Sequence, residues 1–197
     1  MKKFELTTNT QMFLGKKLFQ IKALISFGDV EVGELGGYIE KEENLSQTGD
    51  AWVSDDACVS GNARVFGNAC VSDDAWVSGN ACVSDDAWVS GNACVSGNAC
   101  VSGNARVSGD ARVSDDACVS DNACYTTIKG FGREYRTTTF FKCKDGKVRV
   151  RCGCFYGDLK EFRAIVKETH GESKKAKEYL MIADLMELHF EENENDK

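Results

Sequence analysis

The chain has 197 residues, a formal net charge of −7, no proline and ten cysteines. No stretch approaches the roughly 18 to 20 apolar residues of a membrane span, and lysines interrupt every apolar run near the N-terminus, so we expect neither a membrane helix nor a secretory signal. Seven of the cysteines occupy one slot of a repeat that Trp and Arg also fill. A disulfide framework is therefore not indicated, and we expect a cytoplasmic protein.

Residues 1–48 do not keep the six-residue spacing of the segment that follows. The stretch LFQIKALISF alternates in polarity and predicts a strand, and the glycines of GDVEVGELGGYI supply turns. Since a stack of repeats has an open end that must be covered, we expect an N-terminal β cap whose hairpins merge into an irregular first coil.

From residue 49 to about residue 125 the chain repeats a six-residue unit: Ala, a variable residue, Val, another residue and a turn-forming pair. In GDAWVSDDACVSGNARVF the variable slot holds Trp52, Cys58 and Arg64, and only these residue types recur there. Ala and Val lie two apart, so they share one face of a short strand, while the Gly, Asn and Asp pairs bend the chain. Such a strand buries its Ala and Val only if the chain coils and stacks.

This pattern resembles the hexapeptide-repeat left-handed β-helix. Together with GELGGYIEKEENLSQTGDAWV it is most similar to YdcK-like β-solenoid proteins, which occur in bacteria and phages. The resemblance implies a single-stranded left-handed coil with three units per turn, so that residues 18 apart stack. Solenoids of this type commonly trimerise through one face, and we expect a homo-oligomer, a dimer or a trimer.

Stacking at this period sorts the variable slot into three outward columns. They are Trp52, Cys70, Trp88, Arg106, Cys124; then Cys58, Trp76, Cys94, Arg112; and then Arg64, Cys82, Cys100, Cys118. Exposed aromatic columns indicate a binding surface for a partner, although a Trp can also lie on a strand surface without one. The Cys residues can be small surface residues or can bind a soft metal. Our candidates for binding a protein partner are Trp52, Phe66, Trp76, Trp88, Arg106 and Arg112.

Aspartates gather at one corner of the predicted coil. Stacked carboxylates repel, so we expect this corner to be exposed, or to bind cations or a basic partner. Regular carboxylates can also imitate a phosphate backbone, which suggests, as an alternative function, a phage-encoded inhibitor of a host defence protein that works by acidic mimicry or surface occlusion. The acidic corner consists of Asp55, Asp56, Asp73 and Asp74, with Asp110 further along it.

Residues 126–190 predict a small ββαα module. A two-residue hairpin loop at Asp145-Gly146 would pair Phe141 with Val150. On the other face of the hairpin lies a basic strip of Lys142, Arg149 and Arg151. Because such a strip is more often a solvated face, no nucleic-acid partner is expected.

Two helices follow the hairpin in the prediction. Asp158 with Glu161 forms a capping box, Gly171 closes the first helix, and Ser173 can cap a second one that runs to about Phe190. The stretch YLMIADLMELHF is apolar around most of its circumference, so we expect it to be buried on more than one side, against the hairpin or another subunit. The tail, residues 191–197, is expected to be disordered.

Catalytic and metal-binding sets are not evident. Many proteins with this repeat are acyltransferases, so an acyltransferase is the second alternative function. Those enzymes use a histidine base near the coil, whereas His170 and His189 both lie outside the repeat, which disfavours this alternative. A zinc site of Cys143, Cys152, Cys154 and His170 is not favoured, because Cys143 and Cys152 would lie about 13 Å apart along the hairpin. No catalytic residue, metal or cofactor is expected.

The sequence thus predicts a mainly β protein: a β cap over residues 1–48, a left-handed β-solenoid over 49–125, the ββαα module over 126–190 and the tail. We expect a non-catalytic scaffold in the bacterial host's cytoplasm, away from membranes. It would bind an unidentified protein partner through its outward columns and its C-terminal module.

Overall fold

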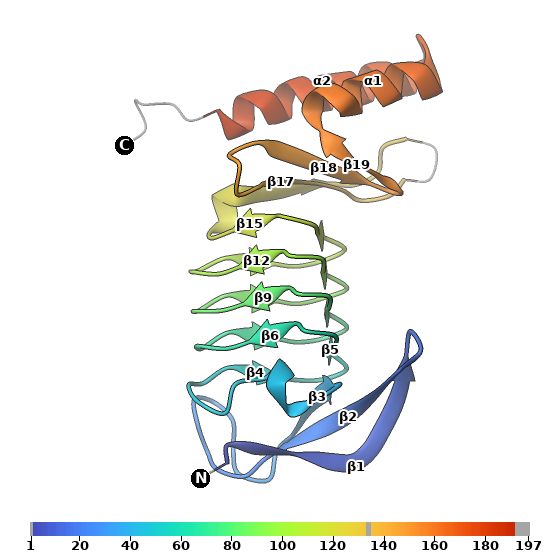
Figure 1. Ribbon diagram of the computed structural model, residues 1–197. Helices are drawn as coiled ribbons and strands as arrows, with labels where there is room; N and C mark the ends of the chain where they lie inside the picture. Colours follow the sequence, from blue (N-terminus) through green and yellow to red (C-terminus); the bar gives the residue numbers. More distant parts are fainter. Residues whose placement is uncertain (1, 133–134, 192–197) are drawn as a thin grey trace. The chain divides into compact units, whose positions relative to one another are not determined.

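The computed structural model describes residues 2–132 and 135–191, and the chain divides into two compact units, residues 1–122 and 123–197. Residues 192–197, which make up nearly all of the predicted tail, lie outside the described residues. The first unit is a stack of coils that begins with a β-hairpin, and the second is a sheet that carries two helices (Figure 1). The predicted mainly β solenoid with a C-terminal two-helix module is therefore confirmed.

The N-terminal cap is a hairpin joined to the first coil. Strand β1 (Phe4–Phe13) pairs antiparallel with β2 (Lys16–Ala23), and β2 pairs antiparallel with β3 (Leu35–Ile39). Strand β2 is the strand predicted from the alternating stretch. β3 then pairs in parallel with the repeat strand β5, and a short 3-10 helix, η1 (Glu42–Asn44), follows it. The cap thus merges into the first coil.

The repeat forms two-residue strands that stack in parallel, each on the strand 18 residues further on. Three faces result, in the orders β4-β7-β10-β13, β5-β8-β11-β14 and β6-β9-β12-β15. Every repeat Ala and Val from Ala51 to Val119 is at most 1% exposed, so these residues fill the interior. The strands are β4 (Trp52–Val53), β5 (Cys58–Val59), β6 (Arg64–Val65), β7 (Cys70–Val71), β8 (Trp76–Val77), β9 (Cys82–Val83), β10 (Trp88–Val89), β11 (Cys94–Val95), β12 (Cys100–Val101), β13 (Arg106–Val107), β14 (Arg112–Val113) and β15 (Cys118–Val119).

The alanine carbonyls of the repeat accept hydrogen bonds from the preceding coil. The N–H of Trp52 donates to the carbonyl of Ala69 at 2.9 Å, and the N–H of Cys70 donates to that of Ala87 at 2.9 Å, one coil further on in each case. The corresponding carbonyls of the first coil, such as that of Ala51, therefore have no donors from a preceding coil. A buried unpaired carbonyl is costly, so this end of the stack needs N–H donors.

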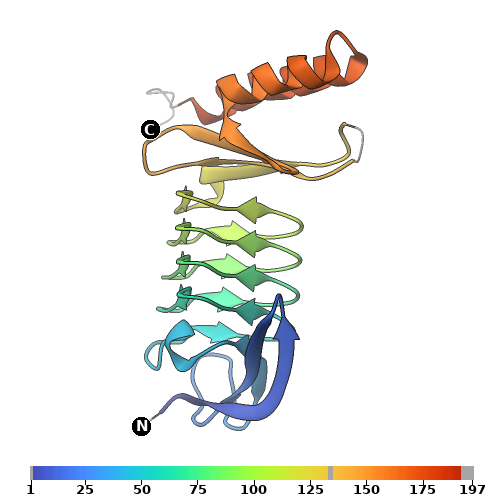
Figure 2. The ribbon, with the colours of Figure 1, turned by 45° about the vertical axis from the view of Figure 1, so that its right-hand side comes forward.

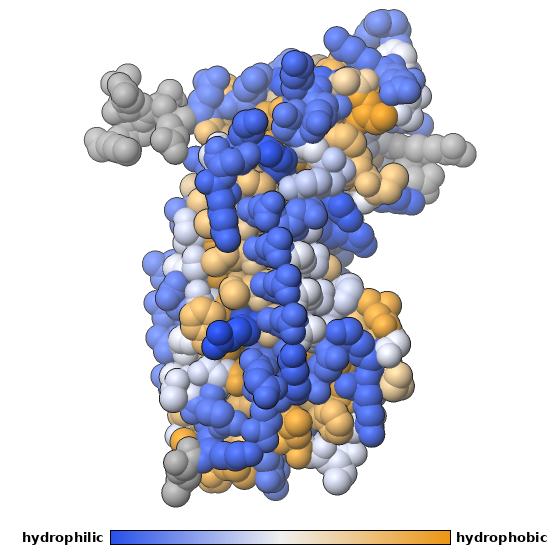
Figure 3. Space-filling model, viewed as in Figure 1, coloured by the Kyte–Doolittle hydropathy of each residue, from blue (hydrophilic) through white to orange (hydrophobic). Residues whose placement is uncertain are grey.

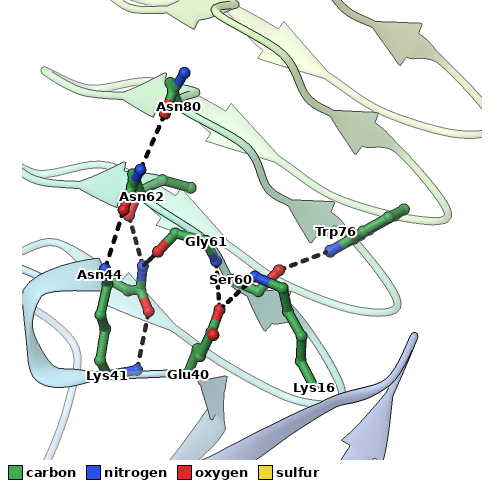
Figure 4. Close-up of polar contacts among 10 residues, drawn as sticks. Lys16, Glu40, Lys41, Asn44, Ser60, Gly61, Asn62, Trp76 and Asn80 are labelled. Carbon is green, nitrogen blue, oxygen red and sulfur yellow. Dashed lines mark hydrogen bonds and ion pairs between the residues drawn. The ribbon is translucent and has the colours of Figure 1, made fainter.

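The cap supplies these donors. The ammonium of Lys3, only 2% exposed, donates to the carbonyls of Gly49 at 3.2 Å and Ala51 at 2.8 Å. The buried Asn44 amide donates in the same way to the carbonyls of Gly61 at 3.2 Å and Ala63 at 2.8 Å (Figure 4). Two polar side chains, one of them a lysine, thus close the open end.

The second unit has four strands, two more than predicted. The antiparallel order is β16 (Tyr125–Ile128), β17 (Thr138–Lys142), β18 (Val148–Cys152) and β19 (Phe155–Asp158). The sequence around Cys152 alternates as one continuous strand, but Gly153 has a φ of +60° and turns the chain back into β19. The module is therefore ββββαα rather than ββαα.

The predicted hairpin register is wrong by one residue. Phe140, not Phe141, pairs with Val150, and Phe141 pairs with Arg149. The loop has three residues rather than two: the N–H of Cys143 donates to the carbonyl of Lys147 at 3.0 Å, and Gly146, with a φ of +74°, precedes the returning strand. A shift of one residue moves every side chain of a strand to the opposite face.

The two helices begin as predicted. Helix α1 (Leu159–His170) starts at a capping box, in which Asp158 accepts from the N–H of Glu161 at 2.8 Å and Glu161 accepts from the N–H of Asp158 at 2.8 Å. Helix α2 (Lys174–Phe190) starts at Ser173, whose hydroxyl accepts from the N–H of Ala176. In Figure 2 both helices lie along one face of the sheet. Neither described helix is long and apolar enough to cross a membrane.

The apolar core of the second unit lies between the sheet and the helices. It contains Phe140 and Val150 from the sheet, Phe162 from α1, and Tyr179 and Ile182 from α2. Within this unit α2 is buried along one side only, since other apolar residues of the helix remain exposed. We expected α2 to be buried on more than one side, but the sheet and α1 together cover only one side of it.

Lys3 makes the stability of the first unit depend on pH. Burial lowers the Lys3 pKa to about 8 from 10.5, although nearby Asp50 opposes this shift. Between these values the unfolded chain holds more protons than the folded one, so the contribution of Lys3 to stability rises with pH, by up to about 1.4 kcal/mol per pH unit.

We expect the stability gap between the wild type and Lys3→Met to be larger at pH 9.5 than at pH 7.5. Urea unfolding followed by tryptophan fluorescence measures it, because all three tryptophans lie in the first unit. Lys2→Met, at the exposed neighbouring lysine, is the control. An equal gap at both pH values would contradict the role of a buried Lys3 charge.

Candidate partner-binding faces of the solenoid

The predicted outward columns are confirmed. Trp52, Cys70, Trp88 and Arg106 pair in register along one face. The columns that begin at Cys58 and at Arg64 also form as predicted. Cys124 is the exception, because it ends the 3-10 helix η2 (Asn122–Cys124) and continues no coil strand.

Trp52 points out of the coil but is not available to a partner. Its side chain is only 5% exposed, because the ring of Phe27 packs edge-on against the indole at 5.4 Å. The Lys3 ammonium lies 4.7 Å from the centre of the same Phe27 ring. The prediction that Trp52 belongs to an exposed partner-binding column is therefore wrong. Nothing in the irregular sequence around Phe27 indicated that contact.

Trp76 is half-buried under the β1–β2 hairpin. The Phe13 ring, at the end of β1, packs edge-on against the indole at 5.3 Å, and the indole N–H points to the Ser60 hydroxyl at 3.5 Å (Figure 4). The register of the hairpin shifts between Leu6 and Thr10, and such irregularities bend a strand. The cap therefore covers part of the second face as well as closing the open end.

Trp88 is the tryptophan that remains open to solvent, with 43% of its side chain exposed. The indole is held in place, because its N–H donates to the Ser72 hydroxyl at 3.0 Å and the Arg106 guanidinium lies 5.6 Å from the ring centre. Phe66, also exposed, carries the Arg64 guanidinium 5.8 Å from its ring centre. Trp88 and Phe66 are thus the exposed, oriented aromatic candidates.

Arg112, the remaining candidate, is exposed at the last strand of the second column, next to Cys94. It lies two strands beyond the Trp76 that the hairpin covers.

The acidic corner serves the backbone of the coil. Asp55 and Asp73 have φ values of +54° and +58°, a left-handed conformation that glycine occupies at most other corners. The Asp55 carboxylate accepts from the N–H of Asp73 at 3.3 Å, and the Asp73 carboxylate accepts from the N–H of Gly91 at 2.9 Å. These two aspartates therefore link successive coils.

Asp56, Asp74 and Asp110 occupy the second position of the same corner. An asparagine interrupts this row, because Asn92 lies between Asp74 and Asp110 and donates to Asp110 at 3.4 Å. Within residues 2–132 and 135–191 no three His, Cys, Asp or Glu side chains are grouped so as to hold a metal ion.

A neighbouring corner carries a ladder of amides rather than acids. Lys41 donates to Asn62, Asn62 to Asn80, Asn80 to Asn98 and Asn98 to Asp116, each at 3.1 to 3.3 Å (Figure 4). Each donor lies on the N-terminal side of its acceptor. On the side of the coils seen in Figure 3, hydrophilic side chains run in a line along the stack. The corners thus bind coil to coil through side chains as well.

The basic strip does not form a single face. In the observed register Arg149 and Arg151 lie on the same face as Phe141, whereas Lys142 lies on the face of Phe140. Arg149 is also bound within the hairpin, because its guanidinium pairs with the Asp145 carboxylate at 2.8 Å. The prediction of a shared basic surface is therefore wrong.

The histidines pack on aromatic rings. His189 lies 4.9 Å from the Phe190 ring, and His170 stacks on Tyr179 at 5.9 Å. A hollow of about 320 Å³ beside Tyr179 is lined by Cys152, Cys154 and His170, but not by Cys143. Burial, and then Cys152, raise the pKa of Tyr179 to about 12, so its hydroxyl stays protonated.

Thiol chemistry is disfavoured in the lower coils. Burial, and then the charge of Asp56, raise the pKa of Cys58 to about 11, and burial followed by Asp55 raises that of Cys70. Since the thiolate is the nucleophile and the metal ligand, the raised pKa values of these two thiols disfavour both roles at neutral pH.

The corner geometry predicts how Asp73 variants behave. Asp73→Ala loses the hydrogen bond to Gly91 and places alanine at positive φ, so it should destabilise the first unit by about 1–2 kcal/mol. Asp73→Asn keeps an acceptor and tolerates this φ, so its free energy of unfolding should stay within about 0.5 kcal/mol of the wild type.

Urea unfolding followed by tryptophan fluorescence measures both variants. Asp74→Ala, which changes the neighbouring carboxylate outside the positive-φ position, is the control and should have little effect. If Asp73→Asn were as unstable as Asp73→Ala, charge rather than corner geometry would explain this aspartate.

The comparisons with known proteins agree with the architecture of the coils. The family model described as the YdcK beta-solenoid repeat matches residues 57–73, 63–79, 99–115 and 105–121, all within the stacked strands. No curated protein matches the chain significantly. The matched segments and the three parallel faces with an 18-residue period together identify the repeat region of this chain as a YdcK-like β-solenoid.

Proposed function

We propose that the protein is a non-catalytic scaffold that binds a protein partner through the solenoid face of Cys70, Trp88 and Arg106. One observation carries this proposal: Trp88 is 43% exposed yet held by the Ser72 hydroxyl at 3.0 Å and flanked by Arg106. Tryptophan and arginine are the residues that most often dominate binding energy at protein interfaces. An indole that is already oriented loses little conformational freedom on binding.

The chemistry of this face describes the partner. Cys70 and Trp88 present an apolar surface on a flat parallel sheet, and Arg106 is exposed beside them. A protein surface with an apolar pocket for the indole and a carboxylate for the guanidinium would fit it. We propose a cytoplasmic location, which suits its ten thiols.

The two alternative functions have less support. Acidic mimicry would use the corner carboxylates, but those of Asp55 and Asp73 accept hydrogen bonds from the backbone of the next coil. An acyltransferase would need a base near the coils, and both histidines belong to the second unit. Occlusion of a host defence protein would use the same Trp88 face, so the identity of the captured partner distinguishes it from a scaffold role.

The test is a quantitative pull-down from a lysate of the source cell. The double variant Trp88→Ala/Arg106→Ala should lose the proteins that the wild type captures. Removing two such central residues is expected to weaken binding by a factor of about 100 or more.

The matched control is Cys100→Ala, on the face of Arg64 and Cys82, which should capture the same proteins as the wild type. Binding of the purified partner is then measured by titration. A partner that both variants retain would place its binding site elsewhere, and turnover of an acyl donor would contradict the non-catalytic proposal.

A further inference from the structure

Helix α2 exposes a stripe of large apolar side chains. Met181, Leu185 and Leu188 are 71%, 54% and 62% exposed. Their spacing of four and three residues places them in one line along the helix, opposite the side that packs in the core. The stripe therefore has the sequence spacing of a helix–helix interface without a partner helix.

The charge at the start of α2 opposes the helix dipole. The first turn holds Lys174, Lys175 and Lys177 and no acidic residue, the last turn holds His189, and Glu191 follows the last residue of the helix. A positive charge near a helix N-terminus is unfavourable. Lys174 pairs with Glu178 within the helix at 3.6 Å, whereas Lys175 and Lys177 form no such pair among the described residues.

Helix α1 of the same unit shows the opposite, favourable distribution. Glu161 lies in its first turn, and Lys167 and His170 lie in its last turn. The two helices are neighbours in one small core, so the unfavourable charges of α2 are not a feature that both helices share. We therefore look for a binding partner of α2 that would stabilise these charges.

A second copy of α2, packed antiparallel, satisfies both features. The centre of the stripe lies midway between Met181 and Leu188, and Lys177 and Glu191 lie about 11 Å and 10 Å from it in opposite directions, at 1.5 Å per residue. When two such helices pair about that centre, Lys177 of one copy lies opposite Glu191 of the other, twice over. The dipoles of antiparallel helices also attract.

Glu191 lines a hollow of the same unit together with Lys147 and Lys160. Arg163 of α1 already binds Asp184 at 2.9 Å and Glu187 at 2.6 Å. These bonds leave Glu191 as the described acidic residue just beyond the apolar stripe. The basic first turn of α2 and Glu191 just beyond its end are thus complementary to each other.

We propose that two copies of the chain associate through their α2 helices, packed antiparallel along Met181, Leu185 and Leu188. This interface is independent of the Trp88 face, which belongs to the first unit. Since the stripe is short, the dimer is expected to dissociate on dilution.

Sedimentation equilibrium of the full-length chain over a concentration series tests the proposal. The wild type should show a reversible monomer–dimer equilibrium. Leu185→Asp should raise the dissociation constant at least about tenfold, since it places two carboxylates in the centre of the interface. Val32→Asp, at an exposed apolar residue of the first unit, and Trp88→Ala are controls that should retain the dimer. Circular dichroism checks that the helices persist.

Charge reversal tests the antiparallel arrangement. Lys177→Glu and Glu191→Lys should each weaken self-association about tenfold, because like charges then face each other twice. Mixing the two variants should restore dimers to the wild-type level, because opposite charges face each other again.

Three results would overturn the proposal. A wild type that stays monomeric at every concentration removes the dimer. A dimer that Leu185→Asp leaves unchanged lies on another surface. Charge variants that do not recover on mixing exclude the antiparallel arrangement.

Discussion

The first unit depends on the hydrogen bonds that join each coil to the next. The N–H of the variable residue donates to an alanine carbonyl one coil further on, so the alanine carbonyls of the first coil have no preceding coil to supply their donors. The cap supplies these missing donors: the ammonium of Lys3 and the amide of Asn44 reach the first-coil carbonyls. Lys3 is buried for that reason, and its lowered pKa is the consequence.

The corners add further links between successive coils. A residue at positive φ is needed at each bend, and glycine or aspartate provides it. Where aspartate is used, as at Asp73, its carboxylate accepts an N–H of the next coil. In the asparagine ladder from Asn62 onward, side-chain amides donate to the next coil instead. The repeat's polar residues are thus mainly structural, and the variable slot remains for recognition.

The cap also determines which residues of the variable slot are exposed to solvent. Phe27 covers Trp52 and Phe13 packs on Trp76, whereas Trp88 lies beyond both contacts and stays exposed beside Arg106. The N-terminal cap therefore closes the end of the coil and also leaves Trp88 as the exposed tryptophan, on one face of the solenoid. The second unit offers a separate surface on α2, whose charges are complementary to a second copy of itself.

The sequence by itself determined the coil, its period of 18 residues, the columns, and the caps of both helices, because each follows from local spacing: Ala and Val two apart, bends at Gly or Asp, and Asp158 with Glu161.

Only the tertiary structure decided which outward residues are exposed to solvent. The contact of Phe27 with Trp52 joins residues 25 apart through an irregular segment, and no periodicity encodes it. The hairpin register was decided by loop geometry at Gly146, where a three-residue loop replaced the two-residue one and moved Lys142 away from Arg149. The side of α2 that faces solvent was also decided by tertiary packing. Helix α2 packs against Phe162 and Val150, and this leaves the stripe at Leu185 exposed, whereas an apolar helix sequence alone does not determine which side is exposed.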